Sequence, residues 1–304
     1  MSARRIALGL KHVLLGRSER SGLLARLLLY LVLLDVALLY LTPILYMIST
    51  MFKNSTDLLD PTVRWIPRTL EWGNLRMAWE GLRFPKTFAN AIVLAGAGAV
   101  FQVVSCSIAG YAFARFRFPF RNLLFGLLIF SFLIPPQTMM VPLFALMKET
   151  GLLNTKWAIL GPDLFGHGIR GSLFVIIFRQ FFRTLPFELE DAARIDGAGP
   201  FRLFLKVMVP LAVPAIVVVF IFSFIWHWNE TYLTGMMVGA NNMTLSNSLF
   251  KMTEVLKELT GRTSEVNETV KMAASFLIIF PPLILYAITQ RWFIEGVERT
   301  GLVD

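Results

Sequence analysis

The residues best suited to a chemical task lie in a charged segment, 185–214, between two long apolar stretches. Glu190 and Asp191 come before Arg194, and Gly197 and Pro200 follow. Acidic side chains are favoured near a helix N-terminus, and Glu190 and Arg194 have the spacing of an i,i+4 ion pair. A glycine after such a run suits a left-handed turn. The pattern predicts a short helix starting near Pro186, a turn at Asp196-Gly197, and a second helix over 201–209.

The residues of this segment suit contact with another surface, and two interpretations of the predicted helix remain. Ala192 and Ala193 are small, so another surface could approach the helix backbone closely. Alternatively, an amphipathic helix of this kind could simply rest among lipid headgroups. Periodicity alone does not choose between a docking helix and a headgroup helix.

The sequence lacks the motifs of the common enzyme classes. Lys86-Thr87 follows Pro85 without the glycine frame of a phosphate-binding loop. The histidines His12, His167 and His227 have no metal-ligand spacing with cysteine or paired acids. Neither Gly-x-Ser-x-Gly nor His-Glu-x-x-His occurs. We therefore predict no catalytic residue, no metal site and no cofactor bound by this chain.

Composition sets the class of protein. Of the 304 residues, 56% are hydrophobic and 16% are charged, whereas soluble domains average about 45–50% and about 25%. Apolar runs of about 20 residues can cross a bilayer as helices, and they are too long for barrel strands. The net charge is +9, but the basic residues lie beside apolar runs, which argues against nucleic-acid binding. The sequence predicts an all-α, polytopic membrane protein.

Six transmembrane helices are expected, and they divide the chain into an ordered series of segments. The spans are 27–48, 88–112, 123–146, 158–181, 207–232 and 272–292, with a bend or break at Pro135-Pro136. The other segments are a basic N-tail at 1–26, a cap segment at 49–87, and a C-tail at 293–304. Residues 88–292 then form a five-helix core that includes the charged loop 183–206.

Orientation follows from lysine and arginine in the short loops. The N-tail has six basic residues against Glu19, and Arg115, Arg117 and Arg121 lie in an acid-free loop. Both segments are expected to be cytoplasmic, which places loop 183–206 and the C-tail on the same side. The segment 52–86, which would then be outside, also carries six basic residues and mildly opposes this assignment. The second outer segment, 234–270, is polar and could contain a short helix at 249–259.

Polar residues within spans are functional candidates by default. Asn229, Glu230 and Tyr232 lie late in the fifth span near Trp228, and amide, acid and aromatic groups suit sugar hydroxyls and ring faces. Helix–helix hydrogen bonding would explain the same residues. Asp163 lies with His167 and Arg170 in a glycine-rich stretch at the start of the fourth span. A broken helix there could line a transport path, or the stretch could be a plain loop.

Asp35 lies in the middle of the first span and has two interpretations. Its carboxyl group could seal a gate, or it could be protonated and without a transport role.

The charged segment resembles the coupling loop of ABC-importer permeases, known as the EAA loop. That pattern requires Glu-Ala-Ala, a glycine four positions later, and a distant Ile-x-Leu-Pro. The matching residues here are Asp191, Ala192, Ala193, Gly197, Val207, Val209 and Pro210. Three of them are conservative departures, with aspartate for glutamate and two valines for isoleucine and leucine. The resemblance implies that the ATPase-coupling residues are Glu190, Asp191, Ala192, Ala193, Arg194, Asp196, Gly197 and Pro210.

Other stretches are similar to the carbohydrate-type branch of these permeases. They are residues 110–119, 134–143, 179–186, 228–230 and 290–293, whereas the tail at 296–301 departs from that branch. The resemblance implies a type I ABC importer permease fold, with two permease subunits forming a heterodimer, an ATPase dimer that holds ATP and Mg²⁺, and an extracytoplasmic solute-binding protein. It also implies a bacterial or archaeal plasma (inner) membrane.

The substrate that this branch implies is a sugar or oligosaccharide, translocated by ATP-driven alternating access. The substrate-path residues would be Asn229, Glu230, Tyr232, Trp228 and Asp163. An importer of glycerol phosphate or another polyol is the alternative within the same family. An intramembrane enzyme or an ATP-independent carrier is the alternative outside it.

Overall fold

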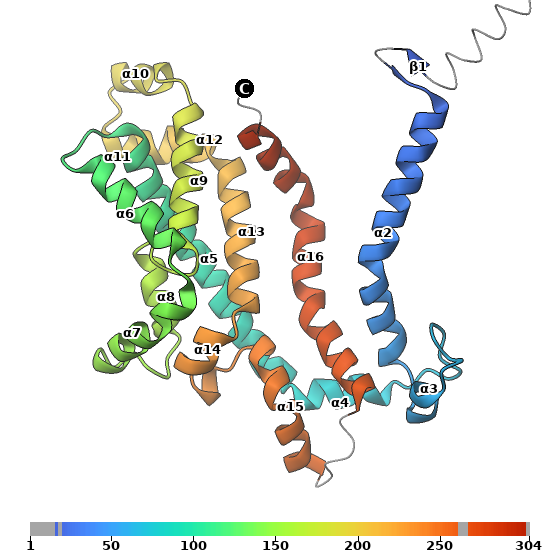
Figure 1. Ribbon diagram of the computed structural model, residues 1–304. Helices are drawn as coiled ribbons and strands as arrows, with labels where there is room; N and C mark the ends of the chain where they lie inside the picture. The colour runs from blue at the N-terminus through green and yellow to red at the C-terminus, as the bar shows by residue number, and fades with distance from the viewer. Residues whose placement is uncertain (1–15, 18–19, 261–266, 302–304) are drawn as a thin grey trace, which may run out of the picture. The chain divides into compact units, whose positions relative to one another are not determined.

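The computed structural model describes residues 16–17, 20–260 and 267–301, with side chains at 22–259 and 267–292. The chain forms two compact units, one of residues 1–75 with 267–276 and one of residues 76–266 with 277–304. Helices joined by turns and loops make up the described residues (Figure 1), apart from one antiparallel pair of two-residue strands, β1 (Gly16–Arg17) and β2 (Arg20–Ser21). Most of the predicted N-tail lies outside the described residues.

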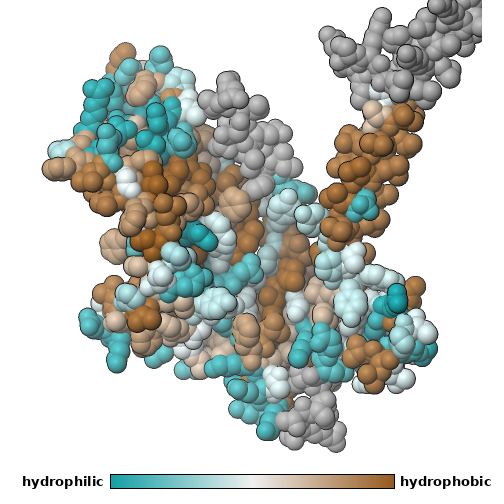
Figure 2. Space-filling view, viewed as in Figure 1, coloured by the Kyte–Doolittle hydropathy of each residue, from teal (hydrophilic) through white to brown (hydrophobic). Residues whose placement is uncertain are grey.

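The first unit contains the apolar helix α2 (Leu23–Met51), which extends the predicted first span at both ends. Hydrophobic side chains cover α2 along its length (Figure 2), and most of them are exposed, as suits contact with lipid tails. A short helix, α3 (Ser55–Leu59), follows α2, and α4 (Gly73–Gly81) begins in this unit.

The segment after α2 is folded back on the end of that helix. The Lys53 ammonium group is buried and donates to the carbonyl oxygens of Val63 at 2.9 Å and Arg64 at 2.8 Å. The Asn74 amide donates to the carbonyl oxygens of Met51 and Lys53. The bond to Met51 satisfies a backbone oxygen that the end of α2 leaves without an intrahelical partner. The Lys53 bonds hold two carbonyl groups of the following loop. Residues 52–74 are thus an ordered structure joined to the end of α2.

The second unit is built around the long helix α5. Its main helices are α5 (Phe84–Arg115), α8 (Trp157–Leu164), α9 (Gly171–Thr184) and α13 (Val213–Asn229). Helix α5 packs against the other three. Gly110 permits the closest approach, because a Cβ atom there would lie 2.5 Å from the Phe178 Cβ atom of α9. Small residues at such contacts let membrane helices pack tightly.

Two of the predicted spans are sharply bent. Helices α6 (Arg121–Leu133) and α7 (Pro136–Glu149) meet at 103°, at the predicted Pro135-Pro136 break. A second run begins with α11 (Pro200–Leu203), the π-helix η1 (Phe204–Met208) and α12 (Val209–Leu211). This run meets α13 at 77°, so the second half of the charged loop enters the fifth span through a bend.

The number of spans differs from the predicted six. Among the described residues, three helices are long and apolar enough to cross a membrane, or up to five if each bent pair is one span. The difference arises at 158–181, where α8 and α9 are separated by residues 165–170. Pro162 lies in the last turn of α8, and Gly166 and Arg170 have positive φ angles of 69° and 61°. Such backbone conformations cannot continue a right-handed helix.

The remaining helices follow α13. They are α14 (Tyr232–Met237), the 3₁₀ helix η2 (Ala240–Asn242), α15 (Leu245–Thr260) and α16 (Glu268–Gly301). Helix α15 is longer than the predicted helix at 249–259. Helix α16 contains Pro281 and Pro282 and continues into the predicted C-tail, whose last residues, 302–304, lie outside the described residues.

Candidate functional site

The charged loop forms α10 (Glu188–Ile195), a turn, and α11. These lie at one end of the second unit, near the C-terminal end of α9 and the N-terminal end of α13 (Figure 1). Helix α10 (Glu188–Ile195) has three acidic residues in its first turn. The predicted start was near Pro186, whereas the helix begins at Glu188, with Phe187 as the N-cap residue. The turn is closed by Gly197, with φ of +77°, and by a bond of 2.9 Å from the Ala198 N–H to the Ala193 oxygen.

Glu190 faces inward from α10, toward the last residue of α5. The Arg115 Nε atom lies 2.8 Å from Glu190 Oε1, and the two side chains are 1% and 3% exposed. Arg115 also donates to the Leu185 carbonyl oxygen at 2.6 Å, and its guanidinium group stacks 4.2 Å from the Phe187 ring centre. Arg194 reaches the other Glu190 oxygen at 3.2 Å, which gives the predicted i,i+4 pair.

The other predicted coupling residues are mostly exposed. Figure 2 shows hydrophilic side chains gathered over α10. The exposed ones are Asp191, Ala192, Arg194, Asp196, Gly197 and Pro210, with Ala193 half-buried and Pro210 in α12 rather than α10. The sequence reasoning missed two apolar side chains of this region, Ile195 and Phe201, which are 87% and 76% exposed. Exposed apolar groups beside charges are typical of a protein–protein contact.

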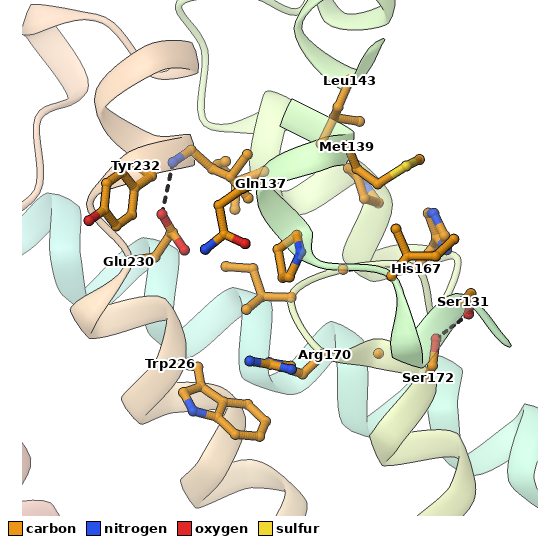
Figure 3. A pocket seen from close by; sticks show the side chains of 18 of the residues that line it. Ser131, Gln137, Met139, Leu143, His167, Arg170, Ser172, Trp226, Glu230 and Tyr232 are labelled. Atoms are coloured by element: carbon orange, nitrogen blue, oxygen red, sulfur yellow. Dashed lines mark hydrogen bonds between the residues drawn. The ribbon is translucent and has the colours of Figure 1, made fainter. Parts of the chain in front are cut away.

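A cavity of about 420 Å³ lies in the second unit, beside the first residues of α9 and the last residues of α13, whereas α10 follows the other end of α9. It is bounded by the α6–α7 break, the connection 165–170, the end of α13 and the start of α14. Its polar and aromatic lining (Figure 3) includes Gln137, His167, Arg170, Trp226, Asn229, Glu230 and Tyr232. Three of the five predicted path residues, Asn229, Glu230 and Tyr232, are therefore brought together in one wall.

Trp228, another of the predicted path residues, does not line this cavity. Its side chain is 1% exposed, and its indole N–H donates to the Ile278 carbonyl oxygen at 3.0 Å. The ring facing the cavity is that of Trp226, two residues earlier. Residues two apart on a helix point to different faces, so only one of these tryptophans can face the cavity.

Asp163 also lies outside the cavity wall. It is fully buried, and its Oδ2 atom lies 3.0 Å from His227 Nε2. Its backbone carbonyl accepts a bond of 2.8 Å from the Ser105 hydroxyl of α5. Asp163 therefore bonds α8 to α13 and α5, a role that neither the path interpretation nor the loop interpretation of this stretch included. His167 and Arg170 from the same stretch do line the cavity.

Two charged side chains set the polarity of the cavity. Arg170 extends from the connection 165–170, with its guanidinium carbon 5.8 Å from the centre of the Trp226 ring. Glu230, which precedes the N-cap residue Thr231, accepts a bond of 2.8 Å from the Leu233 N–H, a backbone donor that the start of α14 leaves without an intrahelical partner. The cavity offers a cation, a carboxylate, amides and aromatic faces to a bound solute.

Comparison with known proteins gives the family. A model of the binding-protein-dependent transport system inner membrane component matches residues 106–299. The chain belongs to this family. It is accordingly a multi-pass inner membrane protein and the permease of a binding-protein-dependent ABC importer, a transport subunit rather than an enzyme. In this family the ATPase is a separate component, and the importer complex includes a binding protein.

Named relatives agree with this assignment. The chain is 32% identical over 209 residues to a probable ABC transporter permease protein of Pyrococcus horikoshii, covering 68% of the chain and 72% of the relative. It is 30% identical over 238 residues to the sn-glycerol-3-phosphate transport system permease protein UgpE of Pectobacterium atrosepticum, covering 76% and 81%.

A solved structure shares the fold. It is a chain from the crystal structure of a bacterial ABC transporter involved in the import of the acidic polysaccharide alginate. The TM-score is 0.70 at 23% identity, with 96% of this chain and 99% of that chain covered. The prediction of an all-helical importer permease is confirmed. In the described part of this chain, no group of three or more His, Cys, Asp or Glu residues could hold a metal ion.

Proposed function

We propose that this permease imports a sugar or oligosaccharide delivered by an extracytoplasmic binding protein, and that the cavity beside Trp226 is part of the solute path. The observation that carries this proposal is the lining of the cavity. Trp226 and Tyr232 provide aromatic faces, and Gln137, Asn229 and Glu230 provide hydrogen-bonding groups. A few polar groups among apolar and aromatic side chains are typical of a small-molecule site.

A polyol phosphate is the second candidate solute, and a specific residue favours it. Arg170 is exposed to the cavity and can form paired hydrogen bonds with a phosphate. Several curated relatives of the chain are named as sn-glycerol-3-phosphate permeases. Glu230 argues against a strongly anionic solute, because its carboxylate lines the same cavity as Arg170.

We further propose that α10, as the EAA-type coupling helix, docks a separate ATPase at the cytoplasmic face. The exposed Asp191, Ala192 and Arg194 would meet that partner, while Glu190 ties the helix to α5 through Arg115. Movement of α10 by the ATPase would then reach α5, which extends from Arg115 back past the cavity region. Both chain ends would be cytoplasmic, and a second, different permease would complete the path.

The coupling role is tested by gentle purification of the chain from its native membrane, followed by mass identification of what accompanies it. The test variant is Gly197→Arg, in which a bulky residue resists the left-handed turn. The matched control is Gly199→Arg, because Gly199 has φ of −68° and a Cβ atom there would meet open space.

We expect the unaltered chain to bring along an ATPase and a second permease, and Gly197→Arg to lose the ATPase. Recovery of the chain alone, or ATPase binding unaffected by Gly197→Arg, would contradict the coupling role of α10. Equal loss in Gly199→Arg would show that the arginine blocks docking in itself, without any need for the turn.

The solute is tested in nanodiscs with the purified importer and its binding protein. Maltose, maltotriose and sn-glycerol 3-phosphate are each assayed for stimulation of ATP hydrolysis. A saccharide importer should respond to a saccharide and lose that response in Trp226→Ala. A response to sn-glycerol 3-phosphate that is lost in Arg170→Gln would instead establish the second candidate.

A further inference from the structure

A buried hydrogen-bonded pair lies behind the wall of the cavity. His227 of α13 and Asp163 of α8 are 1% and 0% exposed in their side chains, with Nε2 and Oδ2 separated by 3.0 Å. The other ring nitrogen, Nδ1, lies 2.8 Å from the Ser223 backbone oxygen. That carbonyl oxygen can only accept, so Nδ1 carries a proton. A further proton must therefore lie between Nε2 and Oδ2, which leaves the pair neutral as a whole.

The pair fits only because a glycine of α5 faces it. A Cβ atom on Gly98 would lie 2.7 Å from His227 Nε2 and 3.0 Å from Asp163 Oδ2. Gly96 lies two residues earlier on the same helix, and a Cβ atom there would meet nothing within 4 Å. Of these two glycines of α5, only Gly98 makes room for the polar contact.

The connection 165–170 is folded onto this pair from the other side. A Cβ atom on Gly168 would collide with Asp163 Oδ1, so the backbone of the connection lies directly on the carboxylate. Gln102 of α5 donates to the Ile169 carbonyl oxygen at 2.9 Å and accepts from the Ser223 hydroxyl at 2.6 Å. The same buried network therefore holds both the connection and α13.

We propose that the Asp163–His227 pair, seated against Gly98, is the positioning device of the cavity. It fixes the connection that carries His167 and Arg170 relative to the end of α13 that carries Asn229 and Glu230. Neither Asp163 nor His227 touches the solute, and both act through the residues that line the cavity. The inference rests on the proposed function only for the role of the cavity as the solute path.

The test measures the distance between the connection 165–170 and the end of α13 by electron–electron double resonance. Nitroxide labels are placed at Phe165→Cys in the connection and at Asn229→Cys in α13, in the assembled importer and with Cys106→Ser in every sample. Phe165 is 87% exposed, and Cys106 is buried. A second pair of labels, at Val104→Cys in α5 and Leu123→Cys in α6, reports on residues that are exposed and do not line the cavity.

We expect Gly98→Ala and His227→Phe to replace one narrow 165–229 distance by a broad or shifted distribution, while the 104–123 distance is unchanged. Gly96→Ala should leave both distances unaltered. Asp163→Asn should keep the narrow distance, because its amide can donate to a neutral His227 Nε2. An unchanged 165–229 distance in Gly98→Ala would overturn the proposal.

The remaining outcomes are also decisive. Equal disturbance of both distances in Gly98→Ala would show a general packing role and would contradict specific positioning. If His227→Phe fails to assemble, the comparison of Gly98→Ala with Gly96→Ala still decides the question. Because no solute is added, a wrong solute assignment leaves this test unaffected.

Discussion

Arg115 and Glu190 form a buried ion pair between the last residue of α5 and the first turn of α10. The contact is 2.8 Å, and the side chains are 1% and 3% exposed although 75 positions separate them in the sequence. Arg115 makes further contacts with Leu185 and Phe187, which lead into α10. The position of α10 is thus fixed relative to the helix that also carries Gly98 and Gln102.

Removal of Arg115 should disturb α10 strongly. Arg115→Gln leaves the Glu190 carboxylate buried without its cation, and breaking such a pair typically costs about 3–5 kcal/mol. We expect a lower thermal midpoint of the purified permease and loss of ATPase stimulation in the assembled importer. Arg117→Gln is the control, because that side chain is exposed two residues further along. Equal behaviour of the two variants in both assays would refute a special role for the pair.

Gly197 should be sensitive even to a methyl group. Its φ of +77° is a left-handed conformation, which costs an alanine about 1–2 kcal/mol. The space around it is open, so the cost is conformational and not steric. Gly197→Ala should lower ATPase coupling without loss of membrane insertion, as measured by hydrolysis in nanodiscs. Gly199→Ala should be near normal, and a larger effect there than at position 197 would contradict this explanation.

The turn at Gly197 and the pair of Glu190 with Arg194 were predictable from the sequence because both are local. Helix-dipole preference, i,i+4 spacing and glycine conformation act within a few residues. The Arg115–Glu190 contact was not predictable, since it depends on the folding of α5 against α9. An arginine at the end of an apolar span indicated orientation, and nothing in its neighbours identified a carboxylate 75 positions away.

The sequence pointed to only some of the residues that line the cavity. Asn229, Glu230 and Tyr232 stood out as polar groups late in a span, and they line the cavity. Trp228 and Asp163 stood out equally, but their side chains form hydrogen bonds to α16 and α13. The direction of each side chain depends on where α13 ends and how 165–170 folds. Hydropathy could not show that 158–181 is two helices, because both halves are apolar.

Asp60, in the segment that follows α2, should titrate at unusually low pH. Its carboxylate accepts bonds from the Thr62 hydroxyl at 2.6 Å and the Thr62 N–H at 2.9 Å, and it pairs with Arg68. These contacts lower the pKa of Asp60 to about 2. A lowered pKa means that the contacts stabilise the fold above the unfolded-state pKa and lose that effect as pH falls toward 2.

Carbon-13 NMR of the Asp60 carboxyl group between pH 6 and pH 2 measures this directly, with Asp60→Asn to assign the signal. Thr62→Val removes the hydroxyl bond, which is the largest cause, and should raise the pKa of Asp60 toward its ordinary value. The interpretation would fail if Thr62→Val left the titration midpoint unchanged. Arg68→Gln should give a smaller rise, because its contribution ranks below that of Thr62.

Gly110 should tolerate no side chain, because it forms the closest contact between α5 and α9. A Cβ atom there would lie 2.9 Å from the Arg179 backbone nitrogen as well as against Phe178. Backbone atoms cannot move aside as a flexible side chain can, and overpacking of this kind typically costs about 1–3 kcal/mol. Gly110→Ala should therefore lower the thermal midpoint, whereas Gly126→Ala, in α6, meets open space and should not. A fall of the same size in both variants would show that the loss comes from replacing a membrane glycine in general, and would contradict the specific contact between α5 and α9.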